Sequence, residues 1–156
     1  AAKKFDNADV EVVDINDYEL PLFSEDKEIE LGKPELAHAF YNKLGEADAI
    51  VISFAEHNGS YTAAFKNLFD WTSRIDMKVY QNKPMIMLAT SVGPGGASSV
   101  LAAATTSAPY FAADVKASIS VPSFFDNFDV ENGVLNHVES NEKIAQAIRT
   151  LVPVTA

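Results

Sequence analysis

The chain has 156 residues, of which 47% are hydrophobic and 22% charged, and it contains no cysteine. This size and composition predict one soluble globular domain with a single core. The lack of cysteine excludes disulfides, thiolate catalysis and metal centres held by cysteine. The net charge of −10 disfavours nucleic acid as a partner, because a polyanion would be repelled. No apolar run reaches the roughly 18 residues of a membrane helix and no signal peptide is evident, so we expect a cytoplasmic protein with no membrane partner.

The first half of the chain contains two predicted strands. In chain order, the patterns predict the end of a helix at residues 1–5, a strand at Val10–Ile15, a long surface connection at Asn16–Lys33, a helix at Pro34–Gly45 and a strand at Ala49–Phe54. The last strand is an unbroken apolar run, which is typical of a parallel sheet covered by helices on both faces. The acidic stretch Glu25–Glu30 within the connection is expected to be a solvated loop.

The second half continues the alternation of helices and strands. In chain order, we expect a helix at Tyr61–Ile75, a strand at Met85–Thr90, a mostly helical stretch at Ala97–Ala113, a strand at Val115–Val121, an aromatic loop at Phe124–Leu135 and a helix at Asn141–Val152 with Ser140 as its N-cap. Strands that alternate with helices predict right-handed βαβ units and a three-layer α/β/α parallel sheet.

Two polar loops follow neighbouring strands of this predicted sheet. The first is Ala55–Ser60 and the second is Ser91–Gly96. Ligands of parallel α/β sheets bind beyond the carboxyl ends of the strands, so the two loops predict one shared binding site. Glycines in the second loop would let the backbone approach a flat or charged ligand, and the following helix N-terminus would favour an electron-rich or anionic group. The structural alternative is a surface turn at Asn58-Gly59, with Ser60 as a helix cap and a tight glycine loop.

His57 is the candidate side chain with the most possible roles. An imidazole can act as a general base, as a metal ligand or as a planar wall beside a ring. The three histidines of the chain are scattered, so no metal site is predicted. The nucleophile-elbow pattern G-x-S-x-G is absent, although this does not exclude a Ser-His-Asp triad. The aromatic side chains of Phe65, Phe69 and Trp71 are expected in the core or at an oligomer contact.

The motifs A-E-H-N-G-S, K-N-L-F-D-W and S-V-G-P-G-G together resemble the NADPH-dependent FMN reductase family. The matching residues are Glu56, Asn58, Ser60, Lys66, Asn67, Asp70 and Trp71, followed by Ser91, Gly93, Gly95 and Gly96. The resemblance implies a flavodoxin-like fold with strand order 2-1-3-4-5. It also implies FMN as cofactor, bound by Ala55, Glu56, His57, Asn58, Ser60, Ser91, Val92, Gly93, Gly95 and Gly96.

The chain departs from the family pattern at three places. Ala55 stands where the family usually has Pro, and His57 stands where it usually has Tyr. The family also begins with a central strand and a loop that holds the FMN phosphate, and neither is found in this sequence. We therefore expect roughly 20 or more upstream residues in the natural protein, enough for a strand, a loop and most of a helix, and weak FMN binding by the chain as it stands.

By resemblance, the expected activity is an oxidoreductase in which NADPH or NADH reduces FMN, and the flavin passes electrons to a small acceptor. Quinones, azo compounds, metal oxyanions and free flavin are the acceptor classes. The flavin carries this chemistry, so no catalytic side chain is assigned. A homodimer or homotetramer is the implied assembly. One alternative is a flavodoxin-type electron carrier that docks basic partners through its acidic surface. A phosphorelay receiver domain fits poorly, because Lys116 lies near the start of its predicted strand rather than at its carboxyl end.

Overall fold

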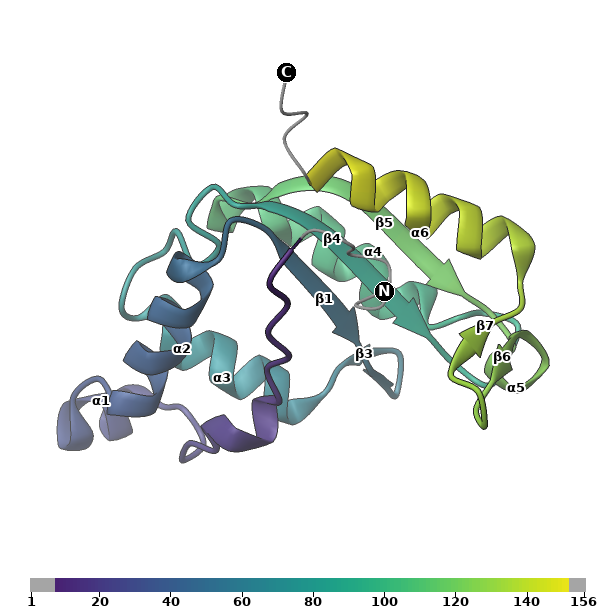
Figure 1. Cartoon of the computed structure of the whole chain (residues 1–156). Coiled ribbons are helices and arrows are strands. Elements are labelled where there is room, and N and C mark those ends of the chain that lie inside the picture. The colour runs from purple at the N-terminus through teal and green to yellow at the C-terminus, as the bar shows by residue number, and fades with distance from the viewer. Residues whose placement is uncertain (1–7, 152–156) are drawn as a thin grey trace, which may run out of the picture.

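A three-stranded parallel sheet forms the centre of the protein, whose computed structural model describes residues 8–151. Its strands are β1 (Ile50–Phe54), β4 (Pro84–Thr90) and β5 (Asp114–Val121), in the order β1-β4-β5 (Figure 1). The register pairs Ile50 with Met85 and Phe54 with Ala89, so β1 and β4 end together. The predicted parallel α/β architecture is confirmed, and this order matches the last three strands of the expected series.

Helices cover both faces of the sheet. One face carries α2 (Glu35–Glu46), α3 (Ala63–Ser73) and α4 (Ser98–Ser107), and the other carries α6 (Val138–Leu151) (Figure 1). The side chains of β4 alternate between the two cores because successive residues of a strand point to opposite faces. Met85 and Met87 pack with the first three helices, while Ile86 packs with α6. This alternation produces the three layers that the sequence predicts.

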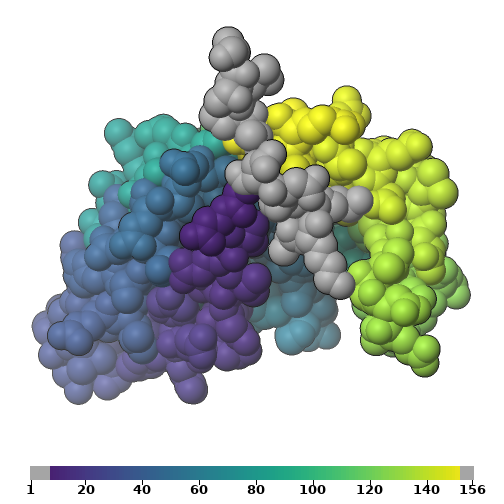
Figure 2. All heavy atoms as spheres, viewed as in Figure 1, coloured from purple at the N-terminus to yellow at the C-terminus, as the bar shows by residue number. Residues whose placement is uncertain are grey.

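The predicted strand at Val10–Ile15 is wrong. Residues 9–14 form no strand, and a 3₁₀ helix, η2 (Ile15–Tyr18), begins where the strand was expected to end. Val12 is 82% exposed, so the apolar alternation of this segment does not face a core. The segment is held instead by polar contacts, among them a 3.1 Å ion pair between Lys43 of α2 and Glu11. Figure 2 shows it on the surface beside the N-terminal helices.

The predicted surface connection contains a helix, α1 (Glu25–Leu31), in place of the expected solvated loop. Ser24 caps it, because its hydroxyl oxygen accepts a hydrogen bond from the backbone N–H of Lys27 at 3.1 Å. The helix has no buried residue, but Glu28 is not solvated as expected, because its carboxylate pairs with Arg74 of the chain after α3 at 2.9 Å.

The C-terminal part differs from the prediction in detail. The Ala97–Ala113 stretch divides into α4 and a 3₁₀ helix, η3 (Ala108–Phe111). The aromatic loop holds a short helix, α5 (Phe124–Asn127), and a hairpin of β6 (Phe128–Asp129) and β7 (Val134–Leu135).

The last helix begins at Val138, so Ser140 is not its N-cap but lies buried in its first turn. His137 takes that position, since its Nδ1 accepts a hydrogen bond from the backbone N–H of Ser140 at 3.3 Å. The predictions for residues 1–5 and for Val152 lie outside the described residues. Between residues 8 and 151, no helix is both long and apolar enough to cross a bilayer.

Candidate functional site

The two predicted loops leave the sheet side by side. Because Phe54 is paired with Ala89, the loop after β1 and the loop after β4 begin at the same edge of the sheet. Both strands run in the same direction, so this is the carboxyl edge, where ligands of such sheets bind. The structure therefore brings Ala55–Ser60 and Ser91–Gly96 together.

The first loop is a tight β-hairpin rather than an open turn. Its strands are β2 (Glu56–His57) and β3 (Ser60–Tyr61), which pair antiparallel. The two central residues, Asn58 (φ 52°) and Gly59 (φ 77°), are both left-handed, as a type I′ turn requires. This geometry leaves the side chains of His57 and Asn58 exposed beyond the sheet edge.

Ser60 is not the cap of the following helix, contrary to the structural alternative considered above. It lies in β3, and Thr62 caps α3 instead. The Thr62 hydroxyl oxygen accepts a hydrogen bond from the backbone N–H of Phe65 at 3.1 Å. The hairpin therefore extends to Tyr61 before the helix begins.

Glu56 joins the first loop to the helix that follows the second. Its Oε2 atom accepts a hydrogen bond from the backbone N–H of Val100, in the first turn of α4, at 2.9 Å. The first N–H groups of a helix have no intrahelical partner and carry partial positive charge, so a carboxylate is favourable there. One N–H group of the helix N-terminus that the sequence offers to an anionic ligand is thus bonded by a side chain of the protein. Glu56 thereby links the first loop to the helix that follows the second.

The second loop is held by residues at the end of β5 and directly after it. Ser120 donates a hydrogen bond from its hydroxyl to the carbonyl of Gly96 at 2.8 Å. The backbone N–H of Phe124 donates to the carbonyl of Ser91, and that of Ser123 to the carbonyl of Gly93, both at 2.9 Å. These bonds fix the backbone of the loop from one side.

Two glycines of this loop have free space around the position of a side chain. No atom lies within 4 Å of where a Cβ would stand on Gly93 or Gly95. Gly96 is different, because its φ is +57° and a Cβ there would meet Ser120 and the backbone of Pro122. The loop therefore combines one glycine required by packing with two that leave room for a close ligand.

A third loop lies at this edge, and the sequence predicts it as an aromatic loop without placing it at the site. It follows β5 at Pro122 and carries Phe125, which is 72% exposed, beside Phe124, which stacks on Phe128 with ring centroids 5.0 Å apart. The sequence predicts that the strand ends at Val121. The position of that end beside the second loop was the signal that could have placed Phe125 near the site.

Some residues of the recognised motifs lie away from the edge. Asn67 and Trp71 on α3 hold the chain segment at Leu20–Phe23, because the Trp71 indole N–H donates to the carbonyl of Pro21 at 2.7 Å. Lys66 pairs with Asp70 at 2.7 Å within the same helix. Among residues 8–151, no three His, Asp or Glu side chains gather in a way that would hold a metal ion.

The sequence matches the NADPH-dependent FMN reductase family over residues 1–126. The chain belongs to this family. It is 38% identical over 90 residues to the NADPH:quinone oxidoreductase of Arabidopsis thaliana, covering 58% of this chain and 44% of that protein. It is also 38% identical over 78 residues to a 2-hydroxy-1,4-benzoquinone reductase of a Burkholderia species, covering 49% of this chain and 42% of that protein. The matched segments thus span less than half the length of these curated relatives.

A solved structure supports the fold. FerB, a flavoenzyme NAD(P)H:(acceptor) oxidoreductase from Paracoccus denitrificans, superposes with a TM-score of 0.67 over 88% of this chain and 74% of that chain, at 20% identity. The predicted family and flavodoxin-like fold are confirmed. The family description names both NADPH and FMN, in agreement with the predicted cofactor and electron donor.

The carboxyl edge of the sheet in this member of the family has features that fit the ring of FMN. Three loops meet there, two glycines are open to close approach, and exposed His57 and Phe125 supply planar side chains. At the N-terminus of α4, Glu56 accepts the N–H of Val100.

Proposed function

We propose that the chain acts as an FMN-dependent NAD(P)H oxidoreductase that passes electrons to a small acceptor. Quinones, azo compounds, metal oxyanions and free flavin are the acceptor classes, and the quinone reductases among its relatives favour the first of them. The observation that supports the proposal best is the meeting of two family-specific loops at one sheet edge, where Glu56 of the first loop bonds Val100 of the helix after the second.

Each loop has a distinct task in this proposal. The backbone of Ala55–Asn58 contacts the pyrimidine side of the flavin, and the backbone of Ser91–Gly96 lines the other side of the ring. His57 adds a planar side chain in the position where the family usually has Tyr. Bound FMN supplies the chemistry of accepting hydride from NAD(P)H and delivering electrons to the acceptor. The protein binds, orients and shields the ring, and no side chain is needed as acid or base.

The test begins with the visible spectrum of the purified chain mixed with FMN. Oxidised flavin has absorption bands at about 375 and 450 nm, and these bands shift when the ring moves from water into a protein site. NADPH oxidation is then followed with a benzoquinone as acceptor. A chain that neither perturbs the FMN spectrum nor oxidises NADPH in the presence of FMN contradicts the proposal.

Two histidine variants localise the site. His57→Ala removes a planar side chain from the proposed flavin contact, so it should weaken FMN binding about three- to tenfold, the range of a single aromatic contact. His38→Ala is the matched control, because His38 is an exposed histidine on α2. Equal FMN affinity in the two variants would place the flavin elsewhere.

The alternative function is that of a flavodoxin-type electron carrier. The net charge of −10 favours docking to basic redox partners. This function predicts FMN binding without NADPH oxidation in the presence of free acceptor, so the kinetic assay separates the two.

We also propose that the chain assembles as a homodimer or homotetramer through the face of α3 and α4. Tyr110, on η3 at the end of α4, is 79% exposed and offers a large contact surface. Light scattering during size-exclusion chromatography measures the mass, and a monomer at micromolar concentration would refute this assembly.

A further inference from the structure

The chain contains two Asn-Gly pairs, and both lie in hairpin turns. Asn58-Gly59 joins β2 to β3 in the first loop of the carboxyl edge, and Asn132-Gly133 lies between β6 and β7. An asparagine followed by glycine is prone to spontaneous deamidation, because glycine has no side chain to hinder its own backbone nitrogen. Both pairs carry the reactive sequence, so the surrounding structure decides which of them reacts.

Deamidation begins when the backbone nitrogen of the glycine attacks the side-chain carbonyl carbon of the asparagine. The nitrogen loses its proton and bonds Cγ, the Cγ–Nδ2 bond breaks, and ammonia leaves with a proton, so that a cyclic succinimide remains. Water then opens the ring at either carbonyl and leaves aspartate or isoaspartate, each with a new carboxylate. Nothing is oxidised or reduced. An asparagine therefore reacts when its carboxamide is free to turn toward the next residue.

The carboxamide of Asn58 is free in this sense. The residue is exposed, and its carboxamide takes no part in the hydrogen bonds made among residues 8–151. The backbone N–H of Gly59 is likewise outside the backbone hydrogen bonds of the described residues. Nothing lies within 4 Å of where a Cβ would stand on Gly59. The attacking nitrogen and the carbon that it attacks are thus both accessible.

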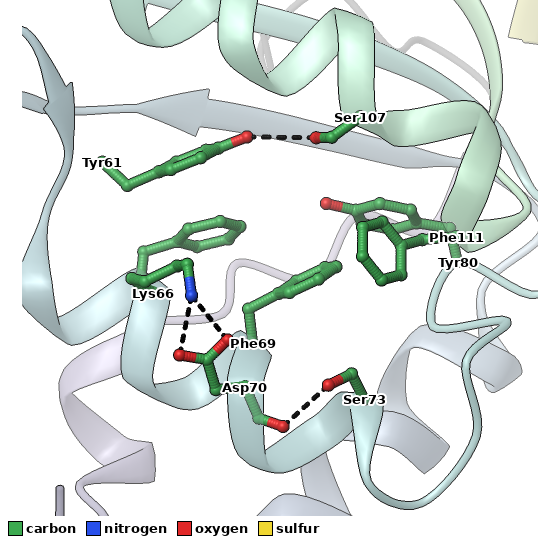
Figure 3. Close-up of a pocket in the computed structure, with 9 residues that line it drawn as sticks. Tyr61, Lys66, Phe69, Asp70, Ser73, Tyr80, Ser107 and Phe111 are labelled. Atoms are coloured by element: carbon green, nitrogen blue, oxygen red, sulfur yellow. Dashed lines mark hydrogen bonds and ion pairs between the residues drawn. The ribbon is translucent and has the colours of Figure 1, made fainter. Parts of the chain in front are cut away.

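The base of the same hairpin is fixed to α4. Oε2 of Glu56 accepts the backbone N–H of Val100 at 2.9 Å. The Tyr61 hydroxyl lies 3.3 Å from the hydroxyl of Ser107, the last residue of α4 (Figure 3). Movement is thereby confined to the two turn residues, which can relax toward the succinimide geometry while the base of the hairpin stays in place.

The carboxamide of Asn132 is held by a neighbouring carboxylate. Its Nδ2 donates a hydrogen bond to Oδ2 of Asp129 at 2.7 Å, and its backbone N–H donates to Oδ1 at 3.0 Å. The side-chain bond, followed by the backbone bond, lowers the pKa of Asp129, so this carboxylate is charged at neutral pH. Attack by Gly133 would break the bond to the carboxamide and place developing negative charge beside Asp129. Asn132 is therefore protected, although it is exposed like Asn58.

We propose that Asn58 is a modification site, at which the first loop deamidates spontaneously to isoaspartate and aspartate while Asn132 is preserved. The product adds one negative charge. Isoaspartate also adds one atom to the backbone of a two-residue turn, so the type I′ geometry is lost. Because Ala55–Asn58 is the proposed flavin contact, deamidation weakens FMN binding as the protein ages, a consequence that rests on the proposed function.

The experiment follows the full chain over weeks at neutral pH, with peptide mapping by mass spectrometry to measure the deamidated fraction at each asparagine. In the folded protein, Asn58 should react about five- to tenfold faster than Asn132, the effect of one hydrogen bond. In urea, where neither turn is formed, the two rates should be nearly equal. Asp129→Ala frees the carboxamide of Asn132, so the rate there should rise toward that of Asn58.

Several outcomes would overturn the proposal. Equal rates at Asn58 and Asn132 in the folded protein are one, and an Asn58 that reacts only in urea is another. An unchanged rate at Asn132 in Asp129→Ala would refute the protection by the carboxylate. If Asp129→Ala does not fold, the wild-type rates with and without urea decide alone.

FMN affinity is compared before and after ageing as a separate measurement. The deamidated wild type should bind FMN at least about threefold more weakly than the fresh protein. Asn58→Gln is the matched control, because a glutamine would have to form a larger ring, and its FMN affinity should not change with ageing. Unchanged FMN binding by the deamidated wild type would contradict the consequence. The deamidation rates need no cofactor, so their failure leaves the proposed function standing.

Discussion

Substitution of Gly96 by alanine should lower the stability of the fold more than most glycine-to-alanine substitutions in this chain. The residue has a φ of +57°, and an added Cβ would contact the Ser120 hydroxyl and lie 3.0 Å from the backbone nitrogen of Pro122. A left-handed alanine costs about 1 kcal/mol. If Ser120 rotates away, its 2.8 Å bond to the Gly96 carbonyl is lost, which costs about 1 kcal/mol. The Pro122 backbone cannot move without disturbing the third loop, which adds at least about 1 kcal/mol.

The expected loss in the free energy of unfolding is therefore about 3 kcal/mol for Gly96→Ala. Urea unfolding measures it, with the fluorescence of Trp71 as the signal, because Trp71 is the single tryptophan and is fully buried. Gly95→Ala is the matched control, since nothing lies within 4 Å of its added Cβ, and it should change stability by less than about 0.5 kcal/mol. Adding Ser120→Ala to Gly96→Ala should recover part of the loss. If Gly96→Ala is as stable as Gly95→Ala, the packing argument for this loop fails.

Three further variants test other contacts. Glu56→Gln keeps the shape of the side chain but removes its charge, so it should lower stability by about 1 kcal/mol and speed hydrogen exchange at the Val100 amide. Trp71→Phe loses the donor to the Pro21 carbonyl and part of the core, so urea unfolding should show a loss of about 2 kcal/mol. Tyr80 has a pKa raised above its ordinary value of 10.0. Its contribution to stability is therefore complete below pH about 10 and declines as the pH rises further. Tyr80→Phe should flatten that alkaline decline when unfolding is measured across the range.

Each of these predictions has a result that contradicts it. Unchanged exchange at Val100 in Glu56→Gln would mean that the carboxylate does not hold α4. A Trp71→Phe variant as stable as the wild type would show that Pro21 needs no donor. Identical alkaline stability curves for the wild type and Tyr80→Phe would place the proton release on another group.

The strands of the sheet could be predicted from the sequence, because β1 and β4 are largely apolar runs and β5 alternates apolar and polar residues. The ends of β1 and β4 fall within one residue of the expected positions, and these ends fix where the two loops begin. Val10–Ile15 shows the limit of such patterns. Alternating valines are compatible with a strand, but a strand also needs a neighbour to pair with, and the segment has none among the described residues. The predicted upstream strand and phosphate loop stay a prediction.

The internal contacts of the candidate site could not be predicted, because they join distant parts of the chain. Glu56 and Val100 are separated by 44 positions, and only the folded sheet brings them together. The exposure of Phe125 at the same edge depends in the same way on β5 lying beside β4. Local turn chemistry was more informative, since Asn58-Gly59 indicated the turn that is observed. Its hairpin strands and the true helix cap, Thr62, were not foreseen.

Asn67 and Trp71 illustrate how a diagnostic motif can be distant from chemistry. Their side chains form hydrogen bonds with the backbone between Leu20 and Phe23 and thereby hold the connection that leads into α1. A family pattern that includes such residues therefore detects chains with the same structural contact, whatever their acceptor. Differences in acceptor preference among relatives should accordingly be sought in the short segments on the sheet rim, where this chain carries histidine in place of tyrosine.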